Sequence, residues 1–313
     1  MNQGSKTKKD WSKGRFREML VWQRRNMWTD ETIERLARWM NLRPGLTAVD
    51  IGCGLGYLGY TYWKYFGDGG HYIGVDIAGK LLGDAAETCK EWAIGGRADF
   101  IEGDAYHIPL PDNTADWVMS QVVMMHLEYP ERVLAEMVRI LKPGGLILCK
   151  EPDNLRPVLV GACSSLPEYD IETRLLVHKV LYTVNRGRKK MGRGDAGIAP
   201  KIPHMLTGLG IDEIEVRVKE SASYLEPPYP TEVQKQTAAN MKKYMLADDQ
   251  FKAHTDEQKE EFLAGGGDIK DFGKFLVIGQ EQRRVQLRQL EKNEFYICGA
   301  YPFYIIKGRK PRK

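Results

Sequence analysis

The feature that most constrains the fold is a glycine-rich stretch from Ala48 to Gly59. It opens with apolar residues typical of the end of a buried strand, and the aromatic-rich segment Tyr57 to Phe66 that follows has the character of a helix. Gly52, Gly54 and Gly56 lie between the two and permit a tight turn. Because glycine has no Cβ, a ligand's polar groups can also approach the backbone at the N-terminus of the helix. The stretch therefore predicts a nucleotide-type binding loop.

Two classes of cofactor compete for this loop. The run from Gly54 to Gly59 satisfies the G-x-G-x-x-G pattern of dinucleotide sites, in which an anionic pyrophosphate sits on the helix N-terminus. Asp50, however, stands two residues before Gly52, and a carboxylate there would repel pyrophosphate. The same carboxylate suits a ligand that carries an ammonium group. S-adenosylmethionine is such a ligand, since it has an amino-acid end and a sulfonium.

The stretch resembles the D-x-G-x-G-x-G motif of class I S-adenosylmethionine-dependent methyltransferases, and three landmarks follow in that family's order. Asp76 ends a second buried strand 20 residues after Gly56, where one βα unit returns a carboxylate to the ribose hydroxyls. Asp104 stands at the exit of a third strand, and Leu-Lys-Pro-Gly-Gly (141–145) separates a helix from a fifth strand. The resemblance covers about Val49 to Asp153. Within the class, the chain is most similar to the ubiquinone and menaquinone biosynthesis methyltransferases.

This resemblance implies S-adenosylmethionine as cofactor and S-adenosylhomocysteine as product. In the family, an acid such as Asp104 accepts from the adenine amino group while the N–H of the next residue, Ala105, meets the ring. Tyr57 could line the site or pack its helix on the sheet. The implied cofactor-binding set is Asp50, Gly52, Cys53, Gly54, Gly56, Tyr57, Asp76, Ile77, Asp104, Ala105 and Gln121.

Five strands that alternate with helices predict an α/β fold with a parallel, doubly wound sheet. The resemblance adds a terminal antiparallel pair, which we place at residues 211–218 and within 295–306. The result is a Rossmann-like, mostly parallel seven-stranded sheet whose last strand is antiparallel, with N-terminal helices and a helical cap. The expected organisation is an N-terminal helical extension or lid (1–42), the methyltransferase core (43–219, with a variable helical and basic segment at 155–200), a helical cap insertion (220–293), and the last strand with a basic tail (294–313).

Local patterns outside the core give further expectations. Residues 11–28 suggest a helix, and Thr29 or Asp30 caps a second one. Residues 185–194 read as a basic loop broken by glycine, and Thr255 to Gln258 as a capping box. We expect a helix at 275–278, and a basic tail from Lys307 to the end of the chain.

Methyl transfer from a sulfonium is an in-line displacement, so the protein's main work is to hold acceptor and methyl group in line and dry. No nucleophilic side chain is needed, although a base helps when the acceptor is a hydroxyl, a thiol or an acidic carbon. His126, shortly after the fourth strand, is the first candidate for a base or acceptor-orienting group, with a structural hydrogen-bonding role as the alternative. Glu151, at the end of the fifth strand, could bind a cationic substrate, take a proton or cap Asn154.

Composition bounds the remaining choices. A formal charge of +4 with 28% charged residues describes an ordinary soluble protein, and neither requires nor excludes an anionic partner. The five cysteines are scattered, with no C-x-x-C pair, which favours reduced thiols in a cytoplasm. We find no apolar run of about 18 residues and no signal peptide, so we expect no membrane span. The spacing of His and Cys offers no metal site.

The interpretation is an S-adenosylmethionine-dependent methyltransferase acting on an O, N, S or C atom of a small organic acceptor. The alternatives are an RNA or protein methyltransferase, a non-catalytic S-adenosylmethionine-binding protein, and an NAD(P)-dependent oxidoreductase, which Asp50 opposes. Glu226-Pro-Pro-Tyr229 resembles a DNA methyltransferase motif, but lies about a hundred residues too late, and is read as a linker. The basic loop 186–193 lacks interleaved aromatic residues, so we expect no nucleic-acid partner. A homodimer stays open, and the sequence does not name the acceptor.

Overall fold

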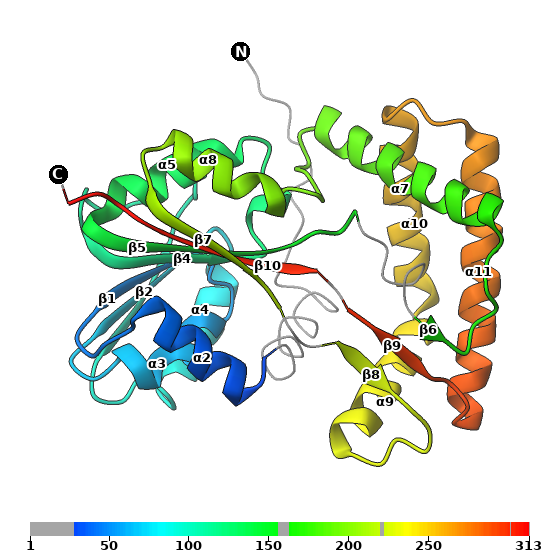
Figure 1. Cartoon of the computed structure of the whole chain (residues 1–313), viewed down its shortest axis with the longest axis horizontal. Helices are drawn as coiled ribbons and strands as arrows, with labels where there is room; N and C mark the ends of the chain where they lie inside the picture. The colour runs from blue at the N-terminus through cyan, green and yellow to red at the C-terminus, as the bar shows by residue number, and fades with distance from the viewer. Residues whose placement is uncertain (1–27, 156–162, 220–221, 301, 313) are drawn as a thin grey trace.

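Seven strands form the central sheet, in the order β3-β2-β1-β4-β5-β10-β7 (Figure 1). β10 runs antiparallel to both of its neighbours, β5 and β7, while the other pairs are parallel. The structure, a computed structural model, describes residues 28–155, 163–219, 222–300 and 302–312. It confirms the predicted Rossmann-like sheet with an antiparallel last strand. The strands are β1 (Thr47–Ile51), β2 (His71–Asp76), β3 (Arg97–Glu102), β4 (Ala115–Gln121), β5 (Leu141–Pro152), β7 (Asp212–Val218) and β10 (Phe303–Arg309).

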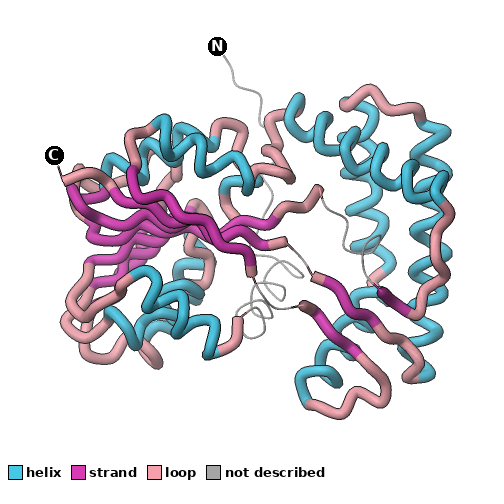
Figure 2. Tube along the Cα trace, in the orientation of Figure 1, coloured by secondary structure: helices cyan, strands magenta, loops and turns pink. Residues whose placement is uncertain are grey.

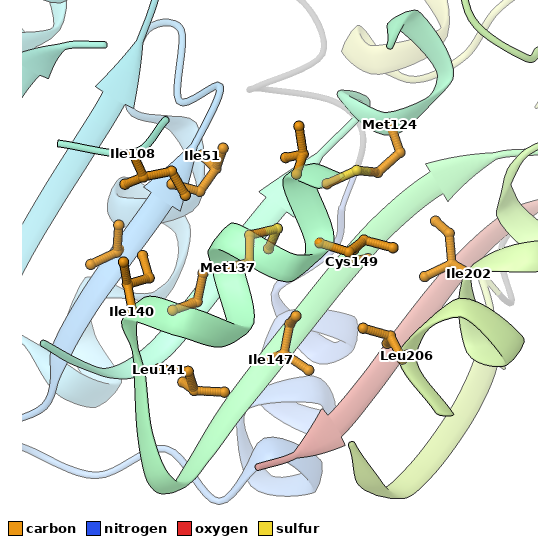
Figure 3. Close-up of a cluster of buried hydrophobic side chains, with 14 of the residues drawn as sticks. Ile51, Ile108, Met124, Met137, Ile140, Leu141, Ile147, Cys149, Ile202 and Leu206 are labelled. Atoms are coloured by element: carbon orange, nitrogen blue, oxygen red, sulfur yellow. The ribbon is translucent and has the colours of Figure 1, made fainter. Parts of the chain in front are cut away.

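Helices cover both faces of this sheet. α2 (Asp30–Met40) and α3 (Tyr57–Phe66) pack on one face through an aromatic cluster that includes Tyr62, Phe66 and Trp117. α5 (Pro130–Ile140) and α8 (Ile202–Gly208) pack on the other. Figure 3 shows Ile147 and Cys149 of β5 between the side chains of α5 and those of α8. α4 (Gly79–Cys89) packs beside β2 and β3.

The alternation of side chains along β5 decides which residues face which layer. Ile147 and Cys149 belong to the core under α5 and α8, whereas Leu146 and Leu148 belong to the core under α2 and α3. Because successive side chains of a strand point to opposite faces, Lys150 lies toward α3 and the next residue, Glu151, toward α5. Both ionisable side chains are fully buried.

A second lobe lies beside the sheet (Figures 1 and 2). It combines a three-stranded sheet, in the order β6-β9-β8, with four helices. Its segments come from two separate parts of the chain, before and after β7. The predicted domain boundaries stay a proposal, since the lobe also takes in part of the segment 155–200. Its elements are β6 (Cys163–Ser164), α7 (Ile171–Lys190), β8 (Ser223–Leu225), α9 (Glu232–Leu246), α10 (Asp248–Ala264), α11 (Ile269–Lys292) and β9 (Ile297–Gly299), and two short 3-10 helices, η1 (Met124–His126) and η2 (Ala199–Lys201), lie within the first lobe.

The basic stretch predicted as a loop at 185–194 is helical up to Lys190, so that prediction is wrong for its first part. Gly187 explains the error. A Cβ on Gly187 would overlap the backbone carbonyl of Glu261, and one on Gly265 would overlap that of Thr183. The glycine is therefore not a helix breaker here, because it allows α7 and α10 to cross at close range.

Two other local predictions are wrong and two are confirmed. Thr255 to Gln258 lies inside α10, which begins seven residues earlier, at Asp248. The single last strand expected at 295–306 is two strands in different sheets, and Lys307 to Arg309, expected in the tail, belong to β10. Lys307 fits in a strand because its Nζ binds Glu215 at 2.8 Å. The helix at 275–278 is confirmed within α11, as is the cap Thr29 of α2. The helix expected from Trp11 lies almost entirely outside the described residues.

Candidate functional site

The glycine loop between β1 and α3 is folded back against the end of β2. Gly52, Gly54 and Gly56 have φ values of 68°, 52° and 71°, in the left-handed region that favours glycine. The N–H groups of Gly52 and Cys53 both donate to the carbonyl of Val75, at 2.8 and 3.1 Å. The N–H of Gly54 donates to the Asp76 carboxylate at 2.8 Å. Three successive N–H groups of the loop are therefore already bonded within the protein.

Asp76 sits at the centre of this arrangement. Its Oδ2 accepts from Gly54 and its Oδ1 from the N–H of Ala78, each at 2.8 Å, which leaves lone pairs on both oxygens for a further donor. Burial raises the pKa of Asp76, although its backbone hydrogen bonds oppose the shift. Ile77, beside it, is 49% exposed and offers an apolar surface at the same edge.

Asp104 and Ala105 extend the site toward β3. The two strands that carry the acids are adjacent, and Gly103, just before Asp104, donates its N–H to the carbonyl of Asp76 at 3.0 Å. Asp104 is exposed, and its Oδ1 accepts from the N–H of Tyr106 at 3.0 Å. The structure thus brings the predicted ribose and adenine acids to neighbouring positions on one sheet edge.

Asp50 differs from the other two acids because it is almost completely buried. Its Oδ2 accepts from the hydroxyl of Tyr72 at 2.8 Å. Burial raises the pKa of Asp50 to about 7, since desolvation outweighs the Tyr72 hydrogen bond. The charge of Asp76 raises this pKa further, and that of Lys150 opposes the shift.

Lys150 is the basic counterpart of Asp50 on the same face of the sheet. Its Nζ donates to the hydroxyl of Tyr62 at 2.8 Å and lies 4.5 Å from the ring centroid of Trp28. Burial lowers the pKa of Lys150 to about 7, and the charge of Asp50 opposes the shift. This residue is absent from the sequence-based site. The signal that could have revealed it is a lysine that follows the apolar run 146–149.

The carboxyl end of β4 supplies the other side of the candidate site. Gln121, half-buried, ends β4 next to β1, and the turn that follows leads into η1. His126 closes η1 and is half-buried. Glu151 lies on the face of the sheet that α5 covers. Its Oε1 accepts from two backbone N–H groups, those of Val123 at 2.7 Å and Met124 at 2.9 Å. Burial raises the pKa of Glu151 to about 7 against these hydrogen bonds.

The predicted cofactor residues therefore gather at one edge. Asp50 lies in β1 and the loop residues follow that strand. Asp76 ends β2 and Ile77 follows it, Asp104 and Ala105 come shortly after β3, and Gln121 ends β4. In open parallel sheets, ligands bind at the carboxyl ends of the strands. Cys53 is buried, which raises the pKa of its thiol well above the usual value and keeps it neutral. Tyr57 is the first, half-buried residue of α3.

Comparison with known proteins decides between the two cofactor classes. A family model described as a methyltransferase domain matches residues 49–149, which include the glycine loop and strands β2, β3 and β4. Residues 49–149 therefore match a methyltransferase domain, and this part of the chain is similar to class I S-adenosylmethionine-dependent methyltransferases. An uncharacterized methyltransferase of Schizosaccharomyces pombe is 38% identical to this chain over 39% of its length and 44% of the relative's. A demethylmenaquinone methyltransferase of Geobacillus is 30% identical over 47% of this chain and 60% of the relative.

The chain spans about half the length of the curated relatives it matches. The crystal structure of a Bacillus halodurans protein aligns with 90% of this chain and 99% of its own, with a TM-score of 0.51 and 14% identity. At that identity the likeness concerns the fold alone.

The residues of the methyltransferase domain fit S-adenosylmethionine better than a dinucleotide. A pyrophosphate needs free N–H groups in the glycine loop, but those of Gly52, Cys53 and Gly54 already bond Val75 and Asp76. The acids at this edge also favour a cation and hydroxyl donors over an anion. The remaining lone pairs of Asp76 suit a ribose.

Other classes of site find less support in the described chain. Within residues 28–155, 163–219, 222–300 and 302–312, no three His, Cys, Asp or Glu side chains gather as metal ligands. No helix in these same ranges is both long and apolar enough to cross a bilayer. A cavity of about 890 Å³ opens at the opposite edge of the sheet, where Lys142 pairs with Asp116 at 2.9 Å. It lies away from the glycine loop and is not part of the site.

Proposed function

We propose that this protein transfers a methyl group from S-adenosylmethionine to an O, N, S or C atom of a small organic acceptor. The observation that carries the proposal is the glycine loop, in which the N–H groups of Gly52, Cys53 and Gly54 bond inward to Val75 and Asp76, at an edge where three acids gather. When bound, the cofactor supplies a methyl group on a positively charged sulfur, which an acceptor can attack in line. The protein's own residues bind the cofactor, orient the acceptor and exclude water from the site.

The cofactor residues divide the work by chemistry. Asp76, with lone pairs left on both oxygens, would accept from the ribose hydroxyls. Asp104 and the N–H of Ala105 would meet the adenine, and Ile77 would cover it. Asp50 would face the ammonium group. Tyr72 bonds one of its carboxylate oxygens, which leaves the other for the ligand, and the charge of Lys150 favours the ionised form of Asp50. Gly52, Gly54 and Gly56 leave room for the cofactor beside the backbone of the loop. Cys53, Tyr57 and Gln121 would line the same site.

His126 is the residue that we propose for orienting the acceptor or taking its proton. It lies on η1, which follows the carboxyl end of β4 and packs on the face of the sheet that α5 covers, whereas Asp50 lies toward the opposite face. Glu151 is a poorer candidate for contact with the acceptor, because it is fully buried and bonded to backbone. No side chain has to act as a nucleophile.

A small acceptor is favoured over a nucleic acid by the state of the basic stretch near the end of α7. Arg193 pairs with Glu260 at 2.8 Å, and Arg188 lies 3.4 Å from Glu261. These cations are therefore engaged within the protein rather than presented to phosphates. We propose that the second lobe caps the acceptor, as expected for the segment 220–293. The demethylmenaquinone methyltransferases among the similar proteins act on small molecules by name.

The test uses S-adenosylmethionine with a radioactive methyl group and an extract of the source cells, separated afterwards into small molecules, RNA and protein. We expect label in the small-molecule fraction, which Asp76→Ala strongly reduces and the exposed control Glu91→Ala leaves unchanged. Label in RNA or protein would overturn the proposed acceptor class. Cofactor binding without transfer to any fraction would identify a non-catalytic binding protein instead.

A further inference from the structure

The turn that follows β4 has a backbone conformation that its sequence does not favour. Val122 has a φ of 57°, in the left-handed region, where a β-branched residue is a rare and strained occupant. Its own N–H donates to the carbonyl of Lys150 at 2.8 Å, which ties the turn to β5. A strained residue persists only where its surroundings hold it, so other contacts must fix this turn.

Glu151 provides those contacts. One carboxylate oxygen accepts from the consecutive N–H groups of Val123 at 2.7 Å and Met124 at 2.9 Å, immediately after the strained residue. Hydrogen bonds to an ionised acceptor are among the stronger ones in proteins. The side chain is fully buried, and its Oε2 has no hydrogen-bond partner among the described residues. Burial of a carboxylate is costly, and the two backbone bonds offset part of that cost.

This turn after β4 also packs on the glycine loop. A Cβ placed on Gly52 would lie 2.6 Å from a methyl carbon of Val123, closer than two carbon atoms approach without overlap. Val123 therefore closes the space above the first glycine of the loop. A contact chain runs from Glu151, through the backbone of Val123, to the loop at which the cofactor is proposed to bind.

We propose that Glu151 is a positioning residue, which holds the strained turn Val122–Met124 so that Val123 packs on Gly52 and shapes the cofactor loop. This role rests on the proposed function, and it replaces a direct role of Glu151 in proton transfer.

The decisive comparison uses Glu151→Ala, Glu151→Gln and the double variant Val122→Gly with Glu151→Ala. S-adenosylhomocysteine affinity is measured by calorimetry, and exchange of the Val123 and Met124 amides is followed without ligand. Glu151→Ala should weaken binding by roughly tenfold to a hundredfold and speed both exchanges, because the turn can then relax. Glu151→Gln keeps an oxygen acceptor and should stay within about threefold of the wild type, since a modest part of the bond strength is lost. Val122→Gly removes the strain and should restore most of the affinity in the double variant.

Two outcomes would overturn this role. If Glu151→Gln binds as weakly as Glu151→Ala while both amides stay protected, the carboxylate acts directly on the ligand. If Val122→Gly fails to restore affinity, strain in the turn is not what Glu151 controls. Should the wild type not bind S-adenosylhomocysteine at all, the proposed function fails, while amide exchange in the same variants still decides whether Glu151 holds the turn.

Discussion

Replacement of Gly52 by alanine tests the packing of the loop most sharply. Two costs add. Alanine in the left-handed region at φ 68° costs about 1–2 kcal/mol. Its Cβ would lie 2.6 Å from Val123, and crowding of this kind costs about 1–3 kcal/mol in a packed site. We therefore expect Gly52→Ala to lower the free energy of unfolding by about 2–5 kcal/mol, and to weaken S-adenosylhomocysteine binding, because the loop must shift.

Gly45→Ala is the matched control. Gly45 has a similar φ of 79°, but a Cβ there would have no heavy atom within 4 Å, so only the conformational cost applies. Urea unfolding of both variants, with calorimetric titration of S-adenosylhomocysteine, separates the two contributions. A second variant that combines Gly52→Ala with Val123→Ala should recover part of the loss in affinity. The reasoning is refuted if Gly52→Ala is no more destabilising than Gly45→Ala.

Two further predictions concern the helix crossing and the buried lysine. Gly187→Ala should lower the free energy of unfolding by about 1–3 kcal/mol or more, because its Cβ meets a backbone carbonyl of α10 that cannot rotate away. Gly83, on α4, has open space around it, so Gly83→Ala should be neutral or slightly stabilising in the same urea titrations. For Lys150, the folded pKa of about 7 lies below the usual 10.5, so the unfolded chain binds more protons between these pH values, and this residue makes stability rise with pH across that window. Lys150→Met should flatten that rise by up to about 1.4 kcal/mol per pH unit, and equal slopes for both proteins would contradict the burial argument.

The sequence predicts the sheet and the cofactor edge well because their signals are local. Asp50 and Asp76 stand at fixed distances from glycines, and β4 has the predicted bounds. Contacts inside the site join residues that are far apart in the sequence, and local patterns do not predict them. Lys150 meets Tyr62 across 88 positions of the chain, and nothing in the sequence around Val122 indicates a left-handed residue.

The second lobe is predicted less well, for a related reason. Gly187 reads as a helix breaker from its propensity, and only the approach of α10 shows why a glycine is kept inside α7. The end of the chain divides between two sheets, since β9 pairs with β8 while β10 enters the central sheet. Pairing of this kind depends on distant partners, which periodicity along one strand does not reveal.

The most direct test of the central claim is calorimetric titration of the purified protein with S-adenosylhomocysteine and, separately, with NAD. The account predicts roughly micromolar affinity for S-adenosylhomocysteine and no binding of NAD, because the loop N–H groups are engaged by Val75 and Asp76. Asp76→Ala should weaken S-adenosylhomocysteine about tenfold to a hundredfold, as expected for loss of charged hydrogen bonds, while Glu91→Ala should not. Binding of NAD, or wild-type affinity in Asp76→Ala, would contradict the assignment of this edge to S-adenosylmethionine.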